Sequence, residues 1–370
     1  MYTESELAAV AARENNNKRK YLVVNRLQGK HIPVSPSAFF GMTGELAEIV
    51  GEAYKGERLL LVGFAETATA IGASLAVRLD AWYMQTTREN IDGVSWLYFT
   101  ESHSHATEQK LVREDIEAII AETDRIVFVE DEVTTGNTIL KIVDIIDREY
   151  GGDVKFSVAS LLNGMDETSR EVYRNRNIGV HYLVKTDHSG YTEIAEGYKK
   201  DGEYFGKNTC LPENPPKIKC VKGGLNARRL VRGSEYAKGC ERLWTEISSD
   251  FADLSGRILV LGTEEFMYPA LFIARELEKE GNTVRCHSTT RSPIAVSREE
   301  DYPLHRRYEL ASLYDDERTT FIYDLNKYDT VLIITDSQCK SERGVNSLAN
   351  ALRNCGNDDI RLIKWENEER

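Results

Sequence analysis

One segment constrains the fold of this chain more than any other: residues 126–138, which read IVFVEDEVTTGNT. Four apolar residues lead into two carboxylates, Glu130 and Asp131, and then into a threonine-rich cluster around Gly136. Apolar residues at helical spacing follow, at positions 139, 142, 143, 145 and 146. The pattern predicts a buried strand, a tight loop and the N-terminus of a helix.

The predicted loop has the chemistry of a phosphate site. Free backbone N–H groups and the positive end of a helix dipole favour an anion, and a glycine lets the backbone close around it. Hydroxyl donors are supplied by Thr134, Thr135 and Thr138. Carboxylates only accept hydrogen bonds, so Glu130 and Asp131 favour hydroxyl donors or a hard cation such as Mg²⁺. The segment thus offers hydrogen-bond donors for a phosphate beside carboxylate acceptors for two hydroxyls. A sugar phosphate has both groups.

On these residues, the segment resembles the phosphoribosyl-diphosphate (PRPP) motif of type I phosphoribosyltransferases. The resemblance implies that Glu130 and Asp131 hold the 2′- and 3′-hydroxyls of the ribose. It also implies a cradle for the 5′-phosphate made of Thr134, Thr135, Gly136, Asn137 and Thr138. The Gly-Lys-Ser/Thr ending of a Walker A loop is missing. The alternative is a strand that ends in solvated acids before an N-capping threonine.

A second loop follows the apolar strand at residues 59–64 and opens another helix. Backbone N–H groups at a helix start suit an anion, although many strand–turn–helix units contain glycine. The resemblance places the pyrophosphate-binding loop here, with Gly63, Phe64, Ala65, Glu66 and Thr67. The resemblance also implies that the Arg88 guanidinium could neutralise charge on the diphosphate that leaves.

Two further segments of this half carry charged or histidine side chains. Residues 101–107 read ESHSHAT, and the resemblance implies a mobile lid that excludes water, with His103, His105 and Lys110 as its residues. A polar surface loop and a metal site formed by histidines on one strand face are the alternatives. Residues 25–34 contain Lys30 and His31, which the resemblance assigns to a hood that selects the base; the alternative is that both are solvated.

Strand-like and helical segments alternate along the chain, which predicts parallel sheets with helices on their faces. Residues 199–224 are polar, contain three prolines and show little periodicity, as is typical of a linker. We therefore expect a PRPP-binding domain at 1–205 with hood elements near the N-terminus. A linker at 206–225 and a second α/β domain at 226–370 would follow.

The second domain repeats patterns of the first. RILVLG (257–262) parallels RLLLVG (58–63), TTRSP (289–293) parallels TTREN (86–90), and DTVLIITD (329–336) parallels DRIVFVED (124–131). The fold class that we predict is α/β: a parallel-sheet, Rossmann-like phosphoribosyltransferase domain followed by an α/β domain that is a candidate diverged copy. The alternative is that two α/β units look alike by chance.

The second copy departs from the PRPP motif. Thr335 replaces the first acid before Asp336, and the threonine-rich loop is replaced by CKSERG, so we do not expect it to bind PRPP. A different anion could be held there by Lys340 and Arg343. A second-domain anion site is predicted from Gly262, Thr263, Arg291, Ser292 and Asp336.

Together with the other motifs, TRSP at 290–293 gives a narrower resemblance. The chain resembles the orotate phosphoribosyltransferase-like proteins with a C-terminal TRSP domain, which occur in biosynthetic gene clusters linked to tellurite resistance and stress. The resemblance covers residues 20–350 or so. It does not supply the substrate.

Composition excludes several classes of protein. A net charge of −13 argues against a general nucleic-acid binder, and no apolar run is long enough to span a bilayer. The N-terminus lacks the apolar core of a signal peptide. Six scattered cysteines without a C-x-x-C pair indicate reduced thiols in a cytoplasm. A homodimer is kept as an open expectation, because no residue specifies an oligomeric state.

The function predicted first is that of an enzyme. It would transfer the 5-phosphoribosyl group of PRPP to a nitrogenous base or base-like acceptor and release pyrophosphate, in the biosynthesis of a nucleotide-like metabolite. Its cofactor would be Mg²⁺, held mainly by PRPP, with Asp131 as an optional ligand. The alternatives are a non-catalytic protein that binds PRPP or a nucleotide and regulates a partner, and an enzyme that runs in reverse or acts on a modified nucleoside.

Overall fold

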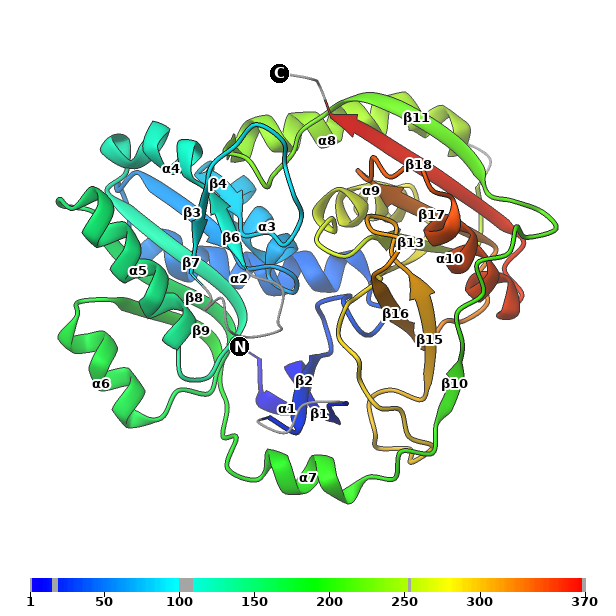
Figure 1. The fold of residues 1–370 in the computed structure, drawn as a ribbon, viewed down its shortest axis with the longest axis horizontal. Helices are drawn as coiled ribbons and strands as arrows, with labels where there is room; N and C mark the ends of the chain where they lie inside the picture. Colours follow the sequence, from blue (N-terminus) through cyan, green and yellow to red (C-terminus); the bar gives the residue numbers. More distant parts are fainter. Residues whose placement is uncertain (1, 15–18, 100–108, 252–253, 368–370) are drawn as a thin grey trace. The chain divides into compact units, whose positions relative to one another are not determined.

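The computed structural model describes residues 2–14, 19–99, 109–251 and 254–367 (Figure 1). The chain forms two compact units, and each unit combines segments from distant parts of the sequence. Unit 1 contains Met1–Glu4, Phe40–Thr186 and Leu225–Lys238, and unit 2 contains Ser5–Phe39, Asp187–Gly224 and Gly239–Arg370. The units differ from the consecutive ranges expected from the sequence, because each unit adds two further segments to its main body.

Unit 1 is built around a six-stranded sheet with the order β12-β4-β3-β7-β8-β9. Neighbouring strands are parallel, except that β12 runs antiparallel to β4. The strands are β3 (Leu59–Gly63), β4 (Trp82–Gln85), β7 (Arg125–Val133), β8 (Lys155–Asn163), β9 (Gly179–Lys185) and β12 (Val231–Arg232). The expected parallel α/β fold is confirmed.

The other elements of unit 1 connect these strands. A short antiparallel pair, β5 (Trp96–Tyr98) and β6 (Lys110–Val112), lies between β4 and β7 in the chain. The helices are α2 (Pro36–Ala53), whose first turn belongs to unit 2, α3 (Thr69–Leu79), α4 (Arg113–Ile119), η1 (Ile120–Glu122), α5 (Asn137–Tyr150) and α6 (Glu167–Asn175). The predicted helix after residue 138 is α5, and it buries Ile139, Ile142, Val143 and Ile146.

Unit 2 has a five-stranded sheet in which all neighbours are parallel, with the order β11-β18-β17-β13-β14. The strands are β11 (Lys217–Gly224), β13 (Arg257–Gly262), β14 (Thr283–Ser288), β17 (Thr330–Thr335) and β18 (Asp359–Asn367). Its helices are α1 (Glu4–Leu7), α7 (Tyr191–Gly197), η2 (Ser249–Phe251), α9 (Tyr268–Lys279) and α10 (Arg343–Asn354), and α8 (Gly233–Ser248) belongs partly to each unit.

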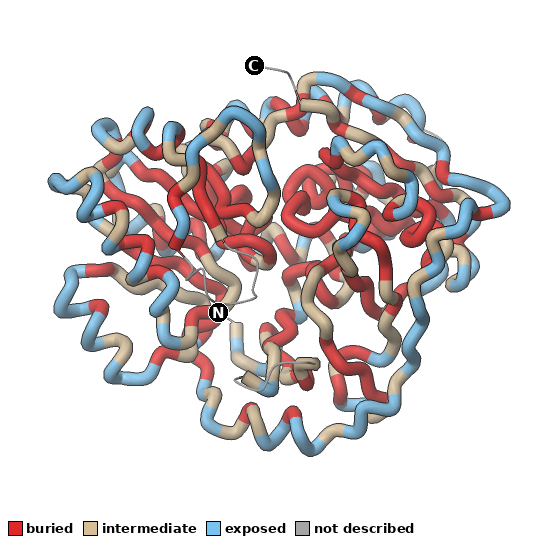
Figure 2. Tube along the Cα trace, viewed as in Figure 1, coloured by how far each residue is buried: buried red, intermediate tan, exposed pale blue. Residues whose placement is uncertain are grey.

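Two smaller sheets complete unit 2. One is the antiparallel pair β1 (Ala8–Ala12) and β2 (Tyr21–Asn25), and the other joins β10 (Glu203–Phe205), β15 (Arg306–Ala311) and β16 (Thr319–Tyr323). In each unit the central strands are buried, whereas the outer helix surfaces are exposed (Figure 2). Strands such as β3 and β17 are buried along their whole length, as expected for parallel strands covered on both faces.

The two main sheets share one topology. The order β4-β3-β7-β8-β9 in unit 1 corresponds to β14-β13-β17-β18-β11 in unit 2. In both series an antiparallel pair also lies in the chain between two sheet strands: β5–β6 between β4 and β7, and β15–β16 between β14 and β17. The last position differs, because β9 follows β8 in the chain whereas β11 precedes β13. This agreement supports the predicted internal duplication and adds a permuted edge strand to it.

Candidate active site

The acidic pair lies at the carboxyl end of β7, a central strand between β3 and β8. Adjacent residues of a strand point to opposite faces of a sheet, so Glu130 and Asp131 face different sides. Asp131 faces the loop between β3 and α3, where its Oδ1 accepts a hydrogen bond of 2.9 Å from Thr67 Oγ1. A segment predicted to bind the ribose hydroxyls and a segment predicted to bind the pyrophosphate are thus in contact.

Glu130 is partly buried and lies among other negative charges. Burial, followed by the charges of Asp131 and Glu132, raises the pKa of Glu130 well above its ordinary value. Three consecutive acids at the end of a buried strand are costly unless a cation or hydroxyl donors offset them.

The loop at 134–138 is shaped by Gly136. This residue has a φ of +70° and precedes the first turn of α5. Tyr173 Oη donates to its carbonyl oxygen at 2.8 Å, and burial raises the Tyr173 pKa, which keeps the phenol a donor. Thr135, Asn137 and Thr138 are exposed. Their donors and the start of α5 are therefore accessible to an anion.

We expect Gly136→Ala to weaken anion binding in this loop at least tenfold. A Cβ at this position would lie 2.2 Å from Tyr173 Oη and would require a left-handed backbone, which costs roughly 1–2 kcal/mol. Gly152→Ala is the matched control, since Gly152 also has a positive φ of +94° but nothing lies within 4 Å of its added Cβ. Calorimetric titration with PRPP and thermal unfolding would measure both variants, and equal affinities in the two would contradict the role of the loop.

The loop after β3 is held by residues that the sequence analysis did not assign to the site. Ala65 N donates to Thr86 Oγ1 at 2.8 Å, and Gln109 Nε2 donates to the Ala65 carbonyl oxygen at 2.8 Å. The Ala65–Glu66 peptide bond is cis. At Gly63, an added Cβ would lie 2.6 Å from Tyr83 Oη. The repeated Thr-Thr-Arg pattern was the signal that could have identified Thr86.

Thr86→Val is expected to lower the affinity of this loop for pyrophosphate by roughly 5- to 150-fold. The substitution removes the acceptor of a buried backbone N–H, which costs about 1–3 kcal/mol. Thr123→Val is a suitable control, because Thr123 is also buried and donates one hydrogen bond of 2.9 Å, to Ile119 O, at the other edge of the sheet. Similar pyrophosphate affinities in the two variants would contradict this assignment.

The predicted lid residues are only partly described. His103 and His105 lie outside the described residues. Lys110 lies in β6 and is buried, and its ammonium donates to Asn90 Oδ1 at 2.6 Å and stacks 4.3 Å above the Trp96 ring. These contacts hold the Lys110 side chain against unit 1, and its assignment to the lid stays a prediction. Arg88 lies in the turn after β4 and is half-buried.

The predicted hood residues belong to unit 2 rather than to the unit that carries the acidic pair. Lys30 is fully buried, and its ammonium donates to the carbonyl oxygens of Glu264 at 2.6 Å and Thr289 at 3.0 Å. His31 is also buried, with its ring edge-on to Tyr323. Burial of both side chains contradicts the alternative that they are solvated, and their role in selecting the base stays a prediction.

Of the residues predicted for a second-domain anion site, Gly262, Thr263 and Asp336 lie at the carboxyl ends of β13 and β17. Thr263 and Tyr314 share a hydrogen bond of 2.8 Å, and Tyr314 Oη donates to Asp336 Oδ1 at 2.7 Å. Gly262 ends β13 just before Thr263. Ser292 lies in a turn, where its N–H donates to Thr290 Oγ1 at 3.2 Å.

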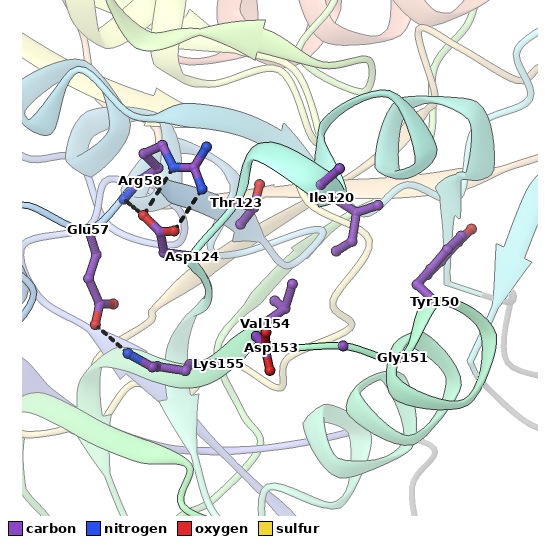
Figure 3. A pocket seen from close by; sticks show the side chains of 12 residues that line it. Glu57, Arg58, Ile120, Thr123, Asp124, Tyr150, Gly151, Asp153, Val154 and Lys155 are labelled. Atoms are coloured by element: carbon purple, nitrogen blue, oxygen red, sulfur yellow. Dashed lines mark hydrogen bonds and ion pairs between the residues drawn. The ribbon is translucent and has the colours of Figure 1, made fainter.

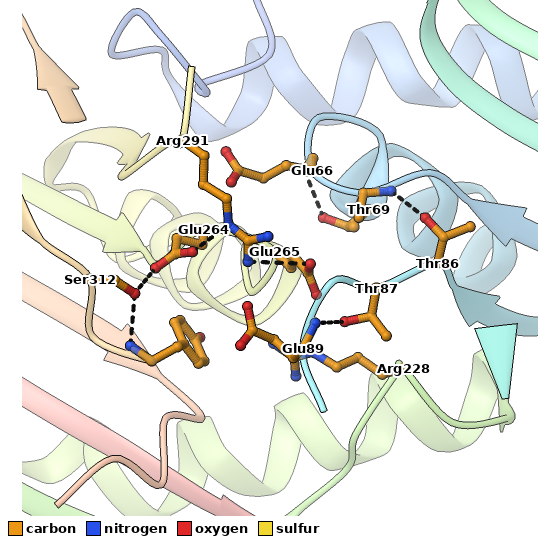
Figure 4. Close-up of polar contacts among 12 residues, drawn as sticks. Glu66, Thr69, Thr86, Thr87, Glu89, Arg228, Glu264, Glu265, Arg291 and Ser312 are labelled. Carbon is orange, nitrogen blue, oxygen red and sulfur yellow. Dashed lines mark hydrogen bonds and ion pairs between the residues drawn. The ribbon is translucent and has the colours of Figure 1, made fainter. Parts of the chain in front are cut away.

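Arg291 of this set is already bound to protein carboxylates. Its Nε donates to Glu264 Oε2 at 2.6 Å, and its second guanidinium arm reaches Glu265 Oε1 at 3.4 Å (Figure 4). The predicted anion-binding guanidinium is therefore engaged in an internal ion pair.

A surface cavity of roughly 600 Å³ lies at the opposite edge of the unit 1 sheet (Figure 3). Four of its charged groups form pairs: Arg58 with Asp124 at 2.8 Å, and Lys155 with Glu57 at 3.2 Å. Ligands of open α/β sheets bind at the carboxyl ends of the strands. This cavity lies at the amino ends and is not the candidate site.

Comparison with known proteins gives two family matches. Residues 7–187 match a family described as phosphoribosyl transferase, and residues 233–352 match one described as the TRSP domain C-terminal to it. Together they cover about four-fifths of the chain. No curated protein matches the chain.

Solved structures of adenine phosphoribosyltransferases are similar to part of the chain. That from Rhodothermus marinus is 16% identical over 49% of this chain and 96% of its own, with a TM-score of 0.35. That from Thermoanaerobacter pseudethanolicus is 17% identical over 49% of this chain and 97% of its own, also with a TM-score of 0.35. Within the described part of the chain, no helix is long and apolar enough to cross a membrane.

Proposed function

Because the chain belongs to the phosphoribosyl transferase family with a C-terminal TRSP domain, we propose that it transfers the 5-phosphoribosyl group of PRPP to a nitrogenous base or base-like acceptor and releases pyrophosphate. The observation that carries this proposal is the hydrogen bond between Thr67 and Asp131, which joins the β3–α3 loop to the acidic end of β7. A substrate with a diphosphate at one carbon of a ribose and a phosphate at another suits this arrangement.

Each segment has one proposed role. Asp131 and Glu130 accept hydrogen bonds from the ribose hydroxyls. Residues 134–138 bind the 5′-phosphate through backbone N–H groups and hydroxyls at the start of α5. Residues 63–67 and Arg88 bind the diphosphate that leaves.

The chemistry that these roles supply is positioning and charge stabilisation. Holding the 5′-phosphate and the ribose fixes the anomeric carbon relative to the incoming nitrogen. Donors fixed around the diphosphate stabilise the negative charge that develops as its bond to carbon breaks. No side chain is assigned as a general base.

The donor set at the end of β7 suits Mg²⁺, which prefers carboxylate and phosphate oxygens. Among the described residues, no group of three or more His, Cys, Asp and Glu side chains could hold a metal on its own. We therefore propose that Mg²⁺ is bound mainly by PRPP, with Asp131 as an optional protein ligand. When bound, the ion would neutralise part of the charge on the leaving diphosphate.

The wider setting is also proposed. All six cysteines are free thiols, which supports a reducing cytoplasm, and the substrates would be small molecules rather than nucleic acid or membrane. The product would be a nucleotide-like metabolite in the tellurite- and stress-associated setting that the sequence resemblance implies. A homodimer is the proposed assembly.

The test is release of pyrophosphate from PRPP and Mg²⁺ by the purified full-length chain, with a panel of purine, pyrimidine and pyridine bases. We expect release that depends on one acceptor and is lost in Asp131→Asn. Tight binding of PRPP without release for any acceptor would indicate a regulatory protein instead. Absence of both binding and release would contradict the proposal.

A further inference from the structure

The loop after the first sheet strand is built in the same way in both units. In unit 1, Ala65 N donates to Thr86 Oγ1 at 2.8 Å; in unit 2, Glu264 N donates to Thr289 Oγ1 at 3.0 Å. The N–H of the same threonine returns to the strand glycine, from Thr86 to Gly63 and from Thr289 to Gly262.

The equivalence continues through the next residues. Thr87 pairs its backbone with Lys110 of β6, and Thr290 pairs its backbone with Phe321 of β16. Each of these threonines also accepts a hydrogen bond from the N–H two residues later. Arg88 and Arg291 therefore occupy the same position in the two copies.

One substitution separates the two loops. Where unit 1 has Ala65, unit 2 has Glu264, whose side chain is 1% exposed. Its carboxylate accepts hydrogen bonds from Arg291 Nε at 2.6 Å and from Ser312 Oγ (Figure 4). It also accepts one from Arg318 at 2.9 Å. Two guanidinium groups and a hydroxyl that converge on one small anion are the donor set of a phosphate or diphosphate site.

We propose that Glu264 is an internal substitute for an anionic ligand, so that unit 2 contains a latent diphosphate site closed by its own carboxylate. An external anion would have to displace a buried carboxylate that is bonded to three donors and tethered beside them. Such a tethered group acts at a high effective concentration, so the wild-type chain excludes diphosphate from unit 2. The arginine of the TRSP sequence then has an internal partner and is not a substrate ligand.

Removing the carboxylate should open the site. Glu264→Ala leaves Arg291 and Arg318 beside a space that a small anion can enter, and we expect it to bind one more inorganic pyrophosphate per chain than wild type in equilibrium dialysis. The increment is one whether or not unit 1 itself binds pyrophosphate, so this result does not depend on the proposed function. Adding Arg291→Ala to the variant should abolish the extra site.

Asp315→Ala is the matched control. Asp315 also contacts Arg318, at 3.6 Å, but it is half-exposed at the rim and should add no site when removed. If folded Glu264→Ala binds no additional pyrophosphate, the network is only structural and the proposal is overturned.

Wild-type protein provides a second test that does not require a mutant to fold. Hydrogen exchange with and without pyrophosphate should leave peptides that cover residues 262–266 and 289–292 unchanged. Protection of these peptides by pyrophosphate in the wild-type chain would show an open anion site there and would also overturn the proposal.

Discussion

Asp131→Asn is expected to abolish phosphoribosyl transfer and to weaken PRPP binding roughly 10- to 150-fold, with the fold intact. The change removes a charged acceptor from the ribose site, and one charged hydrogen bond contributes about 1.5–3 kcal/mol. Asp131 is partly exposed at a strand end and contributes little to the core. Its bond with Thr67 is replaced by a weaker neutral one, so unfolding temperature should barely change.

Glu132→Gln is the control for charge alone. It removes one negative charge from the same acidic run but does not remove the carboxylate that accepts from Thr67. We expect near wild-type PRPP affinity for Glu132→Gln, measured by calorimetry beside Asp131→Asn. Wild-type affinity in Asp131→Asn would contradict the ribose assignment.

The largest expected effect on stability is that of Asp115→Ala, a loss of about 1–3 kcal/mol of the free energy of unfolding. Asp115 is buried and binds Arg229 through two hydrogen bonds of 2.6 and 2.9 Å, and it also accepts from Leu230 N at 2.9 Å. This carboxylate thus anchors the segment that carries β12 to the main body of unit 1. Its loss leaves a partly buried guanidinium and a backbone N–H without their acceptor.

Asp124→Ala provides the comparison, because Asp124 also forms a two-bond pair with Arg58, at 3.1 and 2.8 Å, but both side chains are exposed. Water and salt screen such a pair, so a much smaller change is expected. Chemical denaturation of both variants would measure the difference. Equal losses would mean that Asp115 does not anchor the segment.

The strand, loop and helix at 126–138 could be predicted because the local pattern is unambiguous. Apolar residues form the buried part of β7, and the helical spacing of Ile139, Ile142 and Ile146 gives the buried face of α5. The parallel α/β class followed from the same alternation along the chain. The correspondence between the two copies could be predicted for the same reason, since an apolar strand ends in a glycine in each copy, at Gly63 and at Gly262.

Side-chain partners could not be predicted from local sequence. Lys30 looks like a solvated cation in sequence, but carbonyl oxygens more than 230 positions away in the chain accept its hydrogen bonds. Arg291 was expected to be available for an anion, because nothing in the sequence indicates that Glu264 reaches it. These contacts depend on tertiary packing between distant segments.

Two edge strands, β11 and β12, could not be predicted from the sequence for a related reason. β11 lies at the edge of the unit 2 sheet, and three of its eight residues are lysines, so its sequence resembles a linker. β12 is two residues long and carries almost no periodicity of its own. Short or polar strands take their conformation from a neighbour's backbone, which sequence patterns do not reveal.

The most direct test of the central claim is a crystal structure of the full-length chain with PRPP and Mg²⁺. We predict one PRPP per chain, with its ribose hydroxyls at Glu130 and Asp131, its 5′-phosphate within residues 134–138 and its diphosphate against residues 63–67. PRPP bound at the unit 2 loop that contains Glu264, or at unit 1 with its 5′-phosphate away from residues 134–138, would contradict the account.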